Sequence, residues 1–178
     1  MQNKMAVALE DCPARLVPVG TKIIIPKDTF VTITQALGGN YTVVVNGNMA
    51  RVDGTDAAAL GLKSEILEFD SIDDSGEIKE EQIIQTLKGI YDPEIPVNLL
   101  DLGLIYNVDI NQESKSIKIT MTLTAPGCGM GPVMISDIKY RLSKVPNVKE
   151  VEVDLVFDPP WTRDMMSDEA KLETGLFF

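Results

Sequence analysis

Cys128 lies in a glycine-rich stretch, residues 120–132, whose composition suits close approach by a ligand or partner. Gly127, Gly129 and Gly131 surround the cysteine without side-chain bulk. A strand is expected to end before this loop and a helix to begin after it. The positive end of that helix would favour the thiolate, which is the form of cysteine that attacks electrophiles and binds metal. The pattern indicates a functional thiol, and the alternative is a structural turn with an incidental buried cysteine.

The chain contains no histidine. This absence removes His-based acid–base catalysis, Ser-His-Asp and Cys-His nucleophiles, and zinc sites that need imidazole. An enzyme with Cys128 as its nucleophile would need a lysine or carboxylate as base, and the sequence alone places no such residue. We therefore expect no catalytic residues and a non-enzymatic role, with a cysteine-nucleophile enzyme as an alternative.

Carboxylates are the other candidate functional groups. Asp92 and Glu94 flank Pro93 just after an expected helix, where they could orient a loop, accept backbone hydrogen bonds or bind metal. Stabilisation of a turn is the commoner use of an aspartate such as Asp92. Asp158 stands in a similar proline-rich segment, and the nearby Trp161 is expected to be a packing anchor.

The overall charge limits the classes of partner. The chain has 178 residues, with 16 basic and 27 acidic side chains, and a net charge of −11. Such a balance argues against nucleic acid and against anionic membrane surfaces as partners.

No stretch approaches the roughly 18 apolar residues of a membrane span, and the first residues lack the apolar core of a signal peptide. We therefore expect a cytoplasmic protein.

The N-terminal third has the composition of small β structure. Asn46-Gly47 is a strong hairpin signal, because a type I′ turn needs positive φ at both central positions. Thr55 or Asp56 is expected to cap a short helical turn that ends at Gly61. Strands are expected at residues 29–34, 41–45 and 49–52.

The remainder alternates between helical and strand periodicity. Two segments with apolar residues at every second position, 104–110 and 117–123, predict an antiparallel hairpin that supplies the central strands of a sheet. A third strand is expected at residues 151–157. Helices are expected from the acidic residues 77–81 to about residue 91, from about Pro132 to residue 145, and around residues 168–174.

These elements predict an α+β fold. A small β-rich N-terminal region is followed by a compact two-layer α-β-β-α-β domain with a mixed sheet. The expected boundaries are residues 1–62 for the β-rich region, 63–76 for an acidic linker and 77–178 for the α/β domain. The acidic segment lacks the spaced ligands of a calcium loop, so we interpret it as a solvated linker.

Three segments together carry a family resemblance. They strongly resemble the small α/β domain shared by SufT, PaaD and the cytosolic iron–sulfur targeting proteins, and they lie at residues 91–106, 122–130 and 158–161. Three N-terminal segments look like the extra region that distinguishes SufT, and they lie at residues 35–39, 46–48 and 56–61. The cysteine-containing C-terminal extension of PaaD is absent, because no cysteine follows Cys128.

The resemblance implies an accessory role in iron–sulfur cluster assembly or delivery. The motif cysteine falls on Cys128, which would bind iron or the cluster, and the acid of the Asp-Pro-Glu motif falls on Asp92. The supporting loop residues would be Asp92, Glu94, Thr122, Thr124 and Asp158. The implied partners are SUF assembly proteins and apo iron–sulfur client proteins. A protein-interaction adaptor that binds no metal is an alternative.

A lone cysteine cannot hold a cluster by itself, because iron–sulfur centres usually take four thiolates. A ligand role for Cys128 therefore requires a second copy of the chain, as in a homodimer, a partner protein, a small thiol or transient attachment. Cys12 is far away in sequence, in an N-terminus expected to be flexible, and we expect it to be dispensable.

Overall fold

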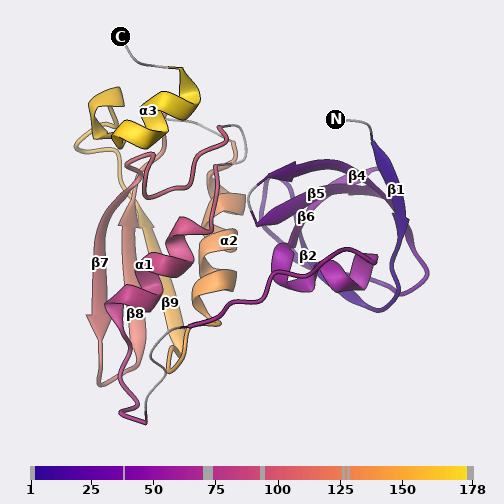
Figure 1. The fold of residues 1–178 in the computed structure, drawn as a ribbon, viewed down its shortest axis with the longest axis horizontal. Coiled ribbons are helices and arrows are strands. Elements are labelled where there is room, and N and C mark those ends of the chain that lie inside the picture. Colours follow the sequence, from indigo (N-terminus) through magenta and orange to yellow (C-terminus); the bar gives the residue numbers. More distant parts are fainter. Residues whose placement is uncertain are drawn as a thin grey trace. The chain divides into compact units, whose positions relative to one another are not determined.

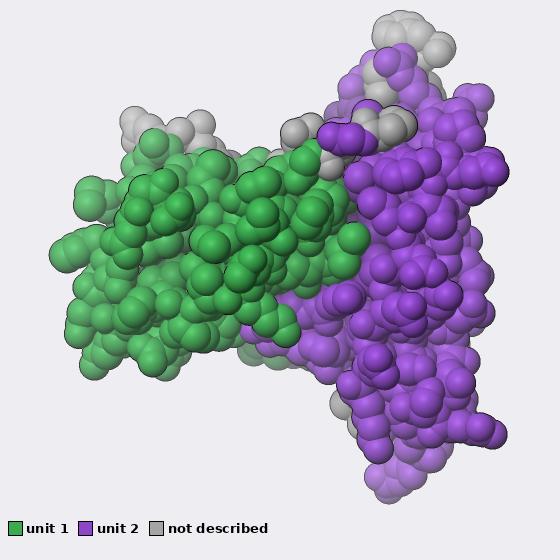
Figure 2. Space-filling view, turned by 180° about the vertical axis from the view of Figure 1, so that it is seen from behind, with its two compact units in different colours: residues 1–67, 129–137 green, residues 68–128, 138–178 purple. Residues whose placement is uncertain are grey.

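The computed structural model describes residues 3–37, 39–69, 74–92, 95–125, 127 and 129–175. The chain divides into two compact units, coloured separately in Figure 2. Unit 1 comprises residues 1–67 and 129–137, and unit 2 comprises residues 68–128 and 138–178. The helix α2 (Gly131–Leu142) is shared, since its residues up to Asp137 belong to unit 1 and the rest to unit 2.

Unit 1 is built on a six-stranded antiparallel sheet in the order β1-β4-β5-β6-β2-β3. The sheet curls around an apolar core of small and β-branched side chains (Figure 1). Its strands are β1 (Lys4–Val7), β2 (Cys12–Leu16), β3 (Lys22–Ile25), β4 (Phe30–Leu37), β5 (Asn40–Val45) and β6 (Asn48–Asp53). The three strands expected from the sequence correspond to β4, β5 and β6.

The turns of unit 1 follow their sequence signals closely. Asn46 and Gly47 have φ values of 48° and 80°, which confirms the expected hairpin between β5 and β6. The 3₁₀ helix η1 (Gly54–Leu60) ends at Gly61 as expected. Its cap was assigned wrongly to Thr55 or Asp56. Asp53 is the cap, since its side chain accepts a hydrogen bond from the Thr55 backbone N–H.

Unit 2 is built on a three-stranded sheet in the order β7-β8-β9. Strands β7 and β8 form the expected antiparallel hairpin, and β8 and β9 are parallel, which confirms a mixed sheet. The hairpin does not supply two central strands, however, because β7 lies at the edge. The elements are α1 (Glu80–Lys88), β7 (Ile105–Asn111), β8 (Ser116–Met121), β9 (Glu150–Leu155), the 3₁₀ helix η2 (Arg163–Met165) and α3 (Asp168–Thr174).

The core of unit 2 reflects the two periodicities of its sequence. Alternate residues of β8 are buried, namely Ile117, Ile119 and Met121. Helix α1 buries Ile83 and Leu87, which lie four residues apart on one face. The mixed α and β character is confirmed, whereas the two-layer arrangement and the domain boundaries stay predictions. Within the described residues, no helix has both the length and the apolar character that a membrane crossing requires.

Candidate functional site

The end of the β8–β9 sheet organises the segment that leads to Cys128. Beyond the last residue of β8, the Thr122 backbone N–H donates to the Leu104 carbonyl at 2.9 Å. On the other side, the Val156 N–H donates to the Met121 carbonyl at 2.8 Å. Strand β8 is therefore held between neighbours on both sides at the point where its chain enters the glycine-rich loop.

The loop that contains Asp92 is tied to the same end of the sheet. The Leu99 N–H donates to the Ile90 carbonyl at 2.9 Å, and the Leu104 N–H donates to the Leu99 carbonyl at 3.1 Å. Asp92 is buried, and its Oδ1 accepts from the Ile95 N–H at 2.9 Å, as in a turn closed by an aspartate side chain. Asp92 therefore accepts a backbone hydrogen bond, which is one of the roles considered for it from the sequence.

The segment after β9 contacts that loop. The Tyr106 hydroxyl donates to the Pro159 carbonyl at 2.7 Å, and the Trp161 Nε1 donates to the Leu102 carbonyl at 2.7 Å. Gly103 has a φ of 80°, and a Cβ added there would collide with the Met165 carbonyl oxygen. The three segments that carry the family resemblance therefore meet at one end of the sheet. They are the described parts of segments 91–106 and 158–161 and the start of segment 122–130.

Thr122 has an unusual environment. Its side chain is completely buried, and its Oγ1 has no hydrogen-bond partner within the described part of the chain. An unpaired buried hydroxyl costs about 1–3 kcal/mol, so such groups are uncommon in proteins. Among the expected supporting residues, Thr124 is half-buried and Asp158 is exposed.

Cys128 and Glu94, two of the expected site residues, lie outside the described residues. The glycines on both sides of Cys128 are described. Gly127 and Gly129 are exposed, and a Cβ added to either would meet no atom within 4 Å. Gly127 also has a φ of 78°, which a larger residue would adopt only with strain. The backbone on either side of Cys128 is therefore open to an approaching molecule.

Cys12 has the opposite environment. The expectation that it lies in a flexible N-terminus was wrong, since Cys12 begins β2 and is fully buried as a free thiol in the core of unit 1. Burial raises the pKa of the Cys12 thiol to about 11, and the negative charges of Asp56 and Glu10 add to this effect. Cys12 is therefore protonated at neutral pH, which is unfavourable for nucleophilic attack and for metal binding.

The described residues contain no group of three or more Cys, Asp or Glu side chains arranged to hold a metal ion. The candidate site is thus a position at the end of the sheet, organised by backbone hydrogen bonds and the carboxylate of Asp92. Sequence reasoning missed Tyr106, Gly103 and Leu104 as the residues that join its segments. The partners of Tyr106 and Gly103 lie far away in sequence, so only the aromatic and glycine types could have drawn attention to these two residues.

Comparisons with known proteins identify relatives of this chain. The model of a family described as iron–sulfur cluster assembly protein matches residues 80–155. An Fe-S protein maturation auxiliary factor from Porphyromonas gingivalis is 51% identical over 96 residues, which cover 54% of this chain and 90% of that protein. The Fe-S protein maturation auxiliary factor SufT of Staphylococcus aureus is 41% identical over 87 residues, which cover 49% of this chain and 98% of that protein.

A solved structure agrees with these relatives. The crystal structure of a domain of unknown function, DUF59, from Bacillus anthracis has 41% sequence identity and a TM-score of 0.52, and the match covers 55% of this chain and 92% of that one. Since these matches cover about half of this chain, the expected resemblance of its N-terminal region stays a prediction. The relatives themselves are matched over nearly their whole length, and the chain therefore belongs to the family of iron–sulfur cluster assembly proteins that includes the SufT maturation factors.

Proposed function

We propose that this chain is an accessory factor that helps to assemble iron–sulfur clusters or to deliver them to client proteins, and that Cys128 binds the iron or cluster. The main support is the convergence of three motif segments at the end of the β8–β9 sheet, where the Cys128 loop begins. The exposed, uncrowded glycines on either side of Cys128 also support this role.

In this role the chain binds the cluster only briefly and shares its coordination with other molecules. A cluster usually needs four thiolates, and Cys128 is the single cysteine in the C-terminal half of the chain. The remaining ligands come from a second copy of the chain, a partner protein or a small thiol. Cys12 is unsuited, because it is buried and its pKa is raised to about 11. Glu94, Thr124 and Asp158 would support the loop or the cargo.

The partners that follow from this role are SUF assembly proteins, which supply the cluster, and apo-proteins, which receive it. The relatives are named as auxiliary factors, which supports a non-enzymatic role here. In such a role the chain binds and releases iron or a cluster without turning over a small-molecule substrate. Its thiolate exchanges with those of the donor and the acceptor.

Anaerobic reconstitution with iron and sulfide tests the proposal. The intact chain, Cys128→Ser and the control Cys12→Ala are each reconstituted, desalted and analysed for bound iron, bound sulfide and visible absorbance. We expect the intact chain and Cys12→Ala to retain iron and Cys128→Ser to lose it. Equal retention by Cys128→Ser would contradict the metal role and favour an adaptor that binds no metal.

A further inference from the structure

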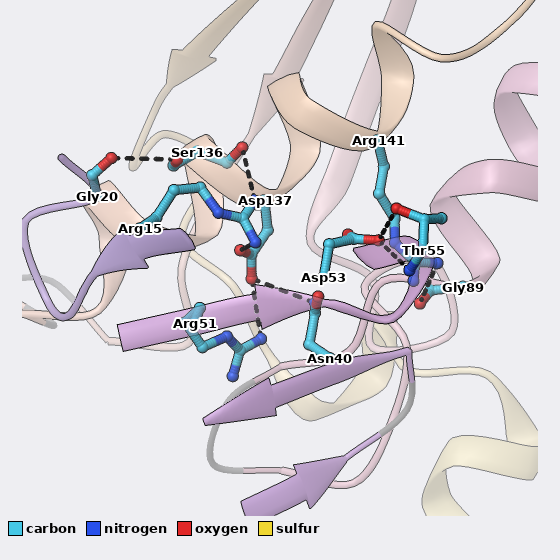
Figure 3. A network of polar contacts seen from close by, with 10 residues as sticks. All are labelled: Arg15, Gly20, Asn40, Arg51, Asp53, Thr55, Gly89, Ser136, Asp137 and Arg141. Carbon is cyan, nitrogen blue, oxygen red and sulfur yellow. Dashed lines mark hydrogen bonds and ion pairs between the residues drawn. The ribbon is translucent and has the colours of Figure 1, made fainter. Parts of the chain in front are cut away.

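A buried charge cluster in unit 1 is not explained by the proposed function. Asp137, near the middle of α2, is 1% exposed and lies between two buried arginines (Figure 3). Its Oδ1 is 3.0 Å from an Nη of Arg15 in β2, and its Oδ2 accepts a hydrogen bond from an Nη of Arg51 in β6 at 2.9 Å. We call these three residues the Asp137 cluster. Through it, two strands of the sheet are joined to the residues that follow the Cys128 loop.

The first half of α2 has further contacts in unit 1. Arg15 donates to the Ser136 carbonyl at 3.3 Å, and the Ser136 hydroxyl donates to the Gly20 carbonyl at 3.2 Å (Figure 3). A Cβ added to Gly20 would lie 2.8 Å from the Pro132 carbonyl oxygen, and Gly20 has a φ of 76°. The turn between β2 and β3 therefore packs closely against the first turns of the helix, and its glycine is needed for that approach.

The buried charges of this cluster depend on one another. Burial raises the pKa of the Asp137 carboxyl, while the positive charges of Arg51 and Arg15 lower it. The negative charge of Asp53 raises the pKa of Asp137, as burial does. Removal of one charge from such a group leaves its partners buried and uncompensated, which is strongly destabilising.

We propose that Asp137 is a positioning residue. Through it, Arg15 and Arg51 of the six-stranded sheet fix the first half of α2 and thereby the loop that carries Cys128. The N-terminal region then controls the reactivity of Cys128 without contributing a ligand. This inference rests on the proposed function only in the choice of Cys128 as the thiol of interest, since the Asp137 cluster involves neither iron nor an iron–sulfur cluster.

The test uses the full chain with Cys12→Ala, so that Cys128 is the one remaining thiol. Asp137→Asn removes the negative charge, and Arg51→Lys is a milder variant because it keeps a cation near Asp137. Asp154→Asn is the matched control, because Asp154 forms an exposed ion pair with Lys118 at 3.0 Å. Hydrogen exchange is measured for peptides from α2 and β8, and the alkylation rate of Cys128 is measured as a function of pH.

We expect Asp137→Asn to accelerate exchange in the first half of α2 by about 100-fold, with β8 nearly unchanged. The alkylation pH profile of Cys128 should shift, with a smaller shift in the same direction for Arg51→Lys and none for Asp154→Asn. An unchanged profile in the folded Asp137→Asn or Arg51→Lys variant would overturn the positioning role, as would equal acceleration in α2 and β8. Failure of Cys128→Ser to lose iron would overturn the proposed function and leave this result untouched.

Discussion

The buried hydroxyl of Thr122 gives a prediction whose sign is opposite to that of most core mutations. Thr122→Val replaces the hydroxyl with a methyl group of similar size and leaves the rest of the side chain in place. Since the Thr122 Oγ1 has no partner among the described residues, the change removes an unpaired polar atom from a fully buried position. We therefore expect Thr122→Val to stabilise the folded protein.

The magnitude follows from the cost of an unpaired buried group. Leaving a neutral polar group buried and unpaired costs about 1–3 kcal/mol, and Thr122→Val should recover much of this as an increase in the free energy of unfolding. For a protein of this length, each 1 kcal/mol raises the thermal midpoint by roughly 2–4 °C. The expected increase is therefore several degrees.

Thr86→Val is the matched control. Thr86 is as deeply buried in α1, but its hydroxyl donates to the Gln82 carbonyl at 2.7 Å. Loss of this hydrogen bond should lower the free energy of unfolding by about 0.5–1.5 kcal/mol. Thermal and urea unfolding of both variants, followed by circular dichroism, gives the two signs directly.

The same variant also tests the site. If the Thr122 hydroxyl serves the loop or the bound cluster, Thr122→Val should impair cluster retention while it raises stability. Substitutions that stabilise a protein at a functional site often have this cost. Destabilisation by Thr122→Val of the same size as that by Thr86→Val would mean that the Thr122 hydroxyl has a hydrogen-bond partner in solution, and it would contradict the expected stabilisation.

Further predictions concern three individual residues. Because the pKa of Cys12 is raised to about 11, this thiol should resist alkylation at neutral pH in the folded chain and react only after denaturation; rapid labelling would contradict its burial. The raised pKa also means that its contribution to stability is present below pH 9.0, the usual value, and is lost as pH rises through about 11, which pH-dependent urea unfolding can detect. Gly103→Ala should destabilise the fold by about 1–3 kcal/mol, since its φ of 80° and the Met165 carbonyl leave no room for a Cβ; neutral behaviour in urea unfolding would count against the close approach. Asp92→Ala should loosen the loop by about 1 kcal/mol, whereas Asp92→Asn keeps an acceptor for the Ile95 N–H and should cost less; equal losses would argue against the observed turn.

Local patterns were sufficient to predict most elements. The alternation in β7 and β8, the Asn46-Gly47 turn and the glycine at the end of η1 depend on residues close in sequence, and all were confirmed. The short helix α3 has the bounds that its sequence predicts, since Ser167 caps it and Gly175 ends it. Such features need no knowledge of distant partners.

Features that depend on distant residues were missed. Strand β1 and the burial of Cys12 in β2 were not recognised, because these strands are short and lack alternation, and are held by pairing with β4, β3 and β6. Arg15, Arg51 and Asp137 gave no signal at all, since charged residues are normally exposed and their pairing spans 86 residues or more.

The sequence indicated which types of residue form the candidate site, but it indicated only part of how they are arranged. The glycines around Cys128 and the turn-forming role of Asp92 follow from composition and spacing. The junctions at Gly103 and Tyr106, and the buried hydroxyl of Thr122, depend on tertiary contacts that no local pattern encodes. The roles of all the expected site residues in binding the cluster stay predictions, namely those of Cys128, Asp92, Glu94, Thr122, Thr124 and Asp158.

Activity of a cluster-dependent enzyme in cells that lack this chain tests whether Cys128 is required for iron–sulfur protein maturation. The cells are supplied with the intact chain, Cys128→Ser or Cys12→Ala at matched levels, and the enzyme is assayed in anaerobic extracts alongside an enzyme that has no cluster. We expect the intact chain and Cys12→Ala to restore the cluster-dependent activity and Cys128→Ser not to restore it, with the second enzyme unaffected. Full restoration by Cys128→Ser would contradict this requirement.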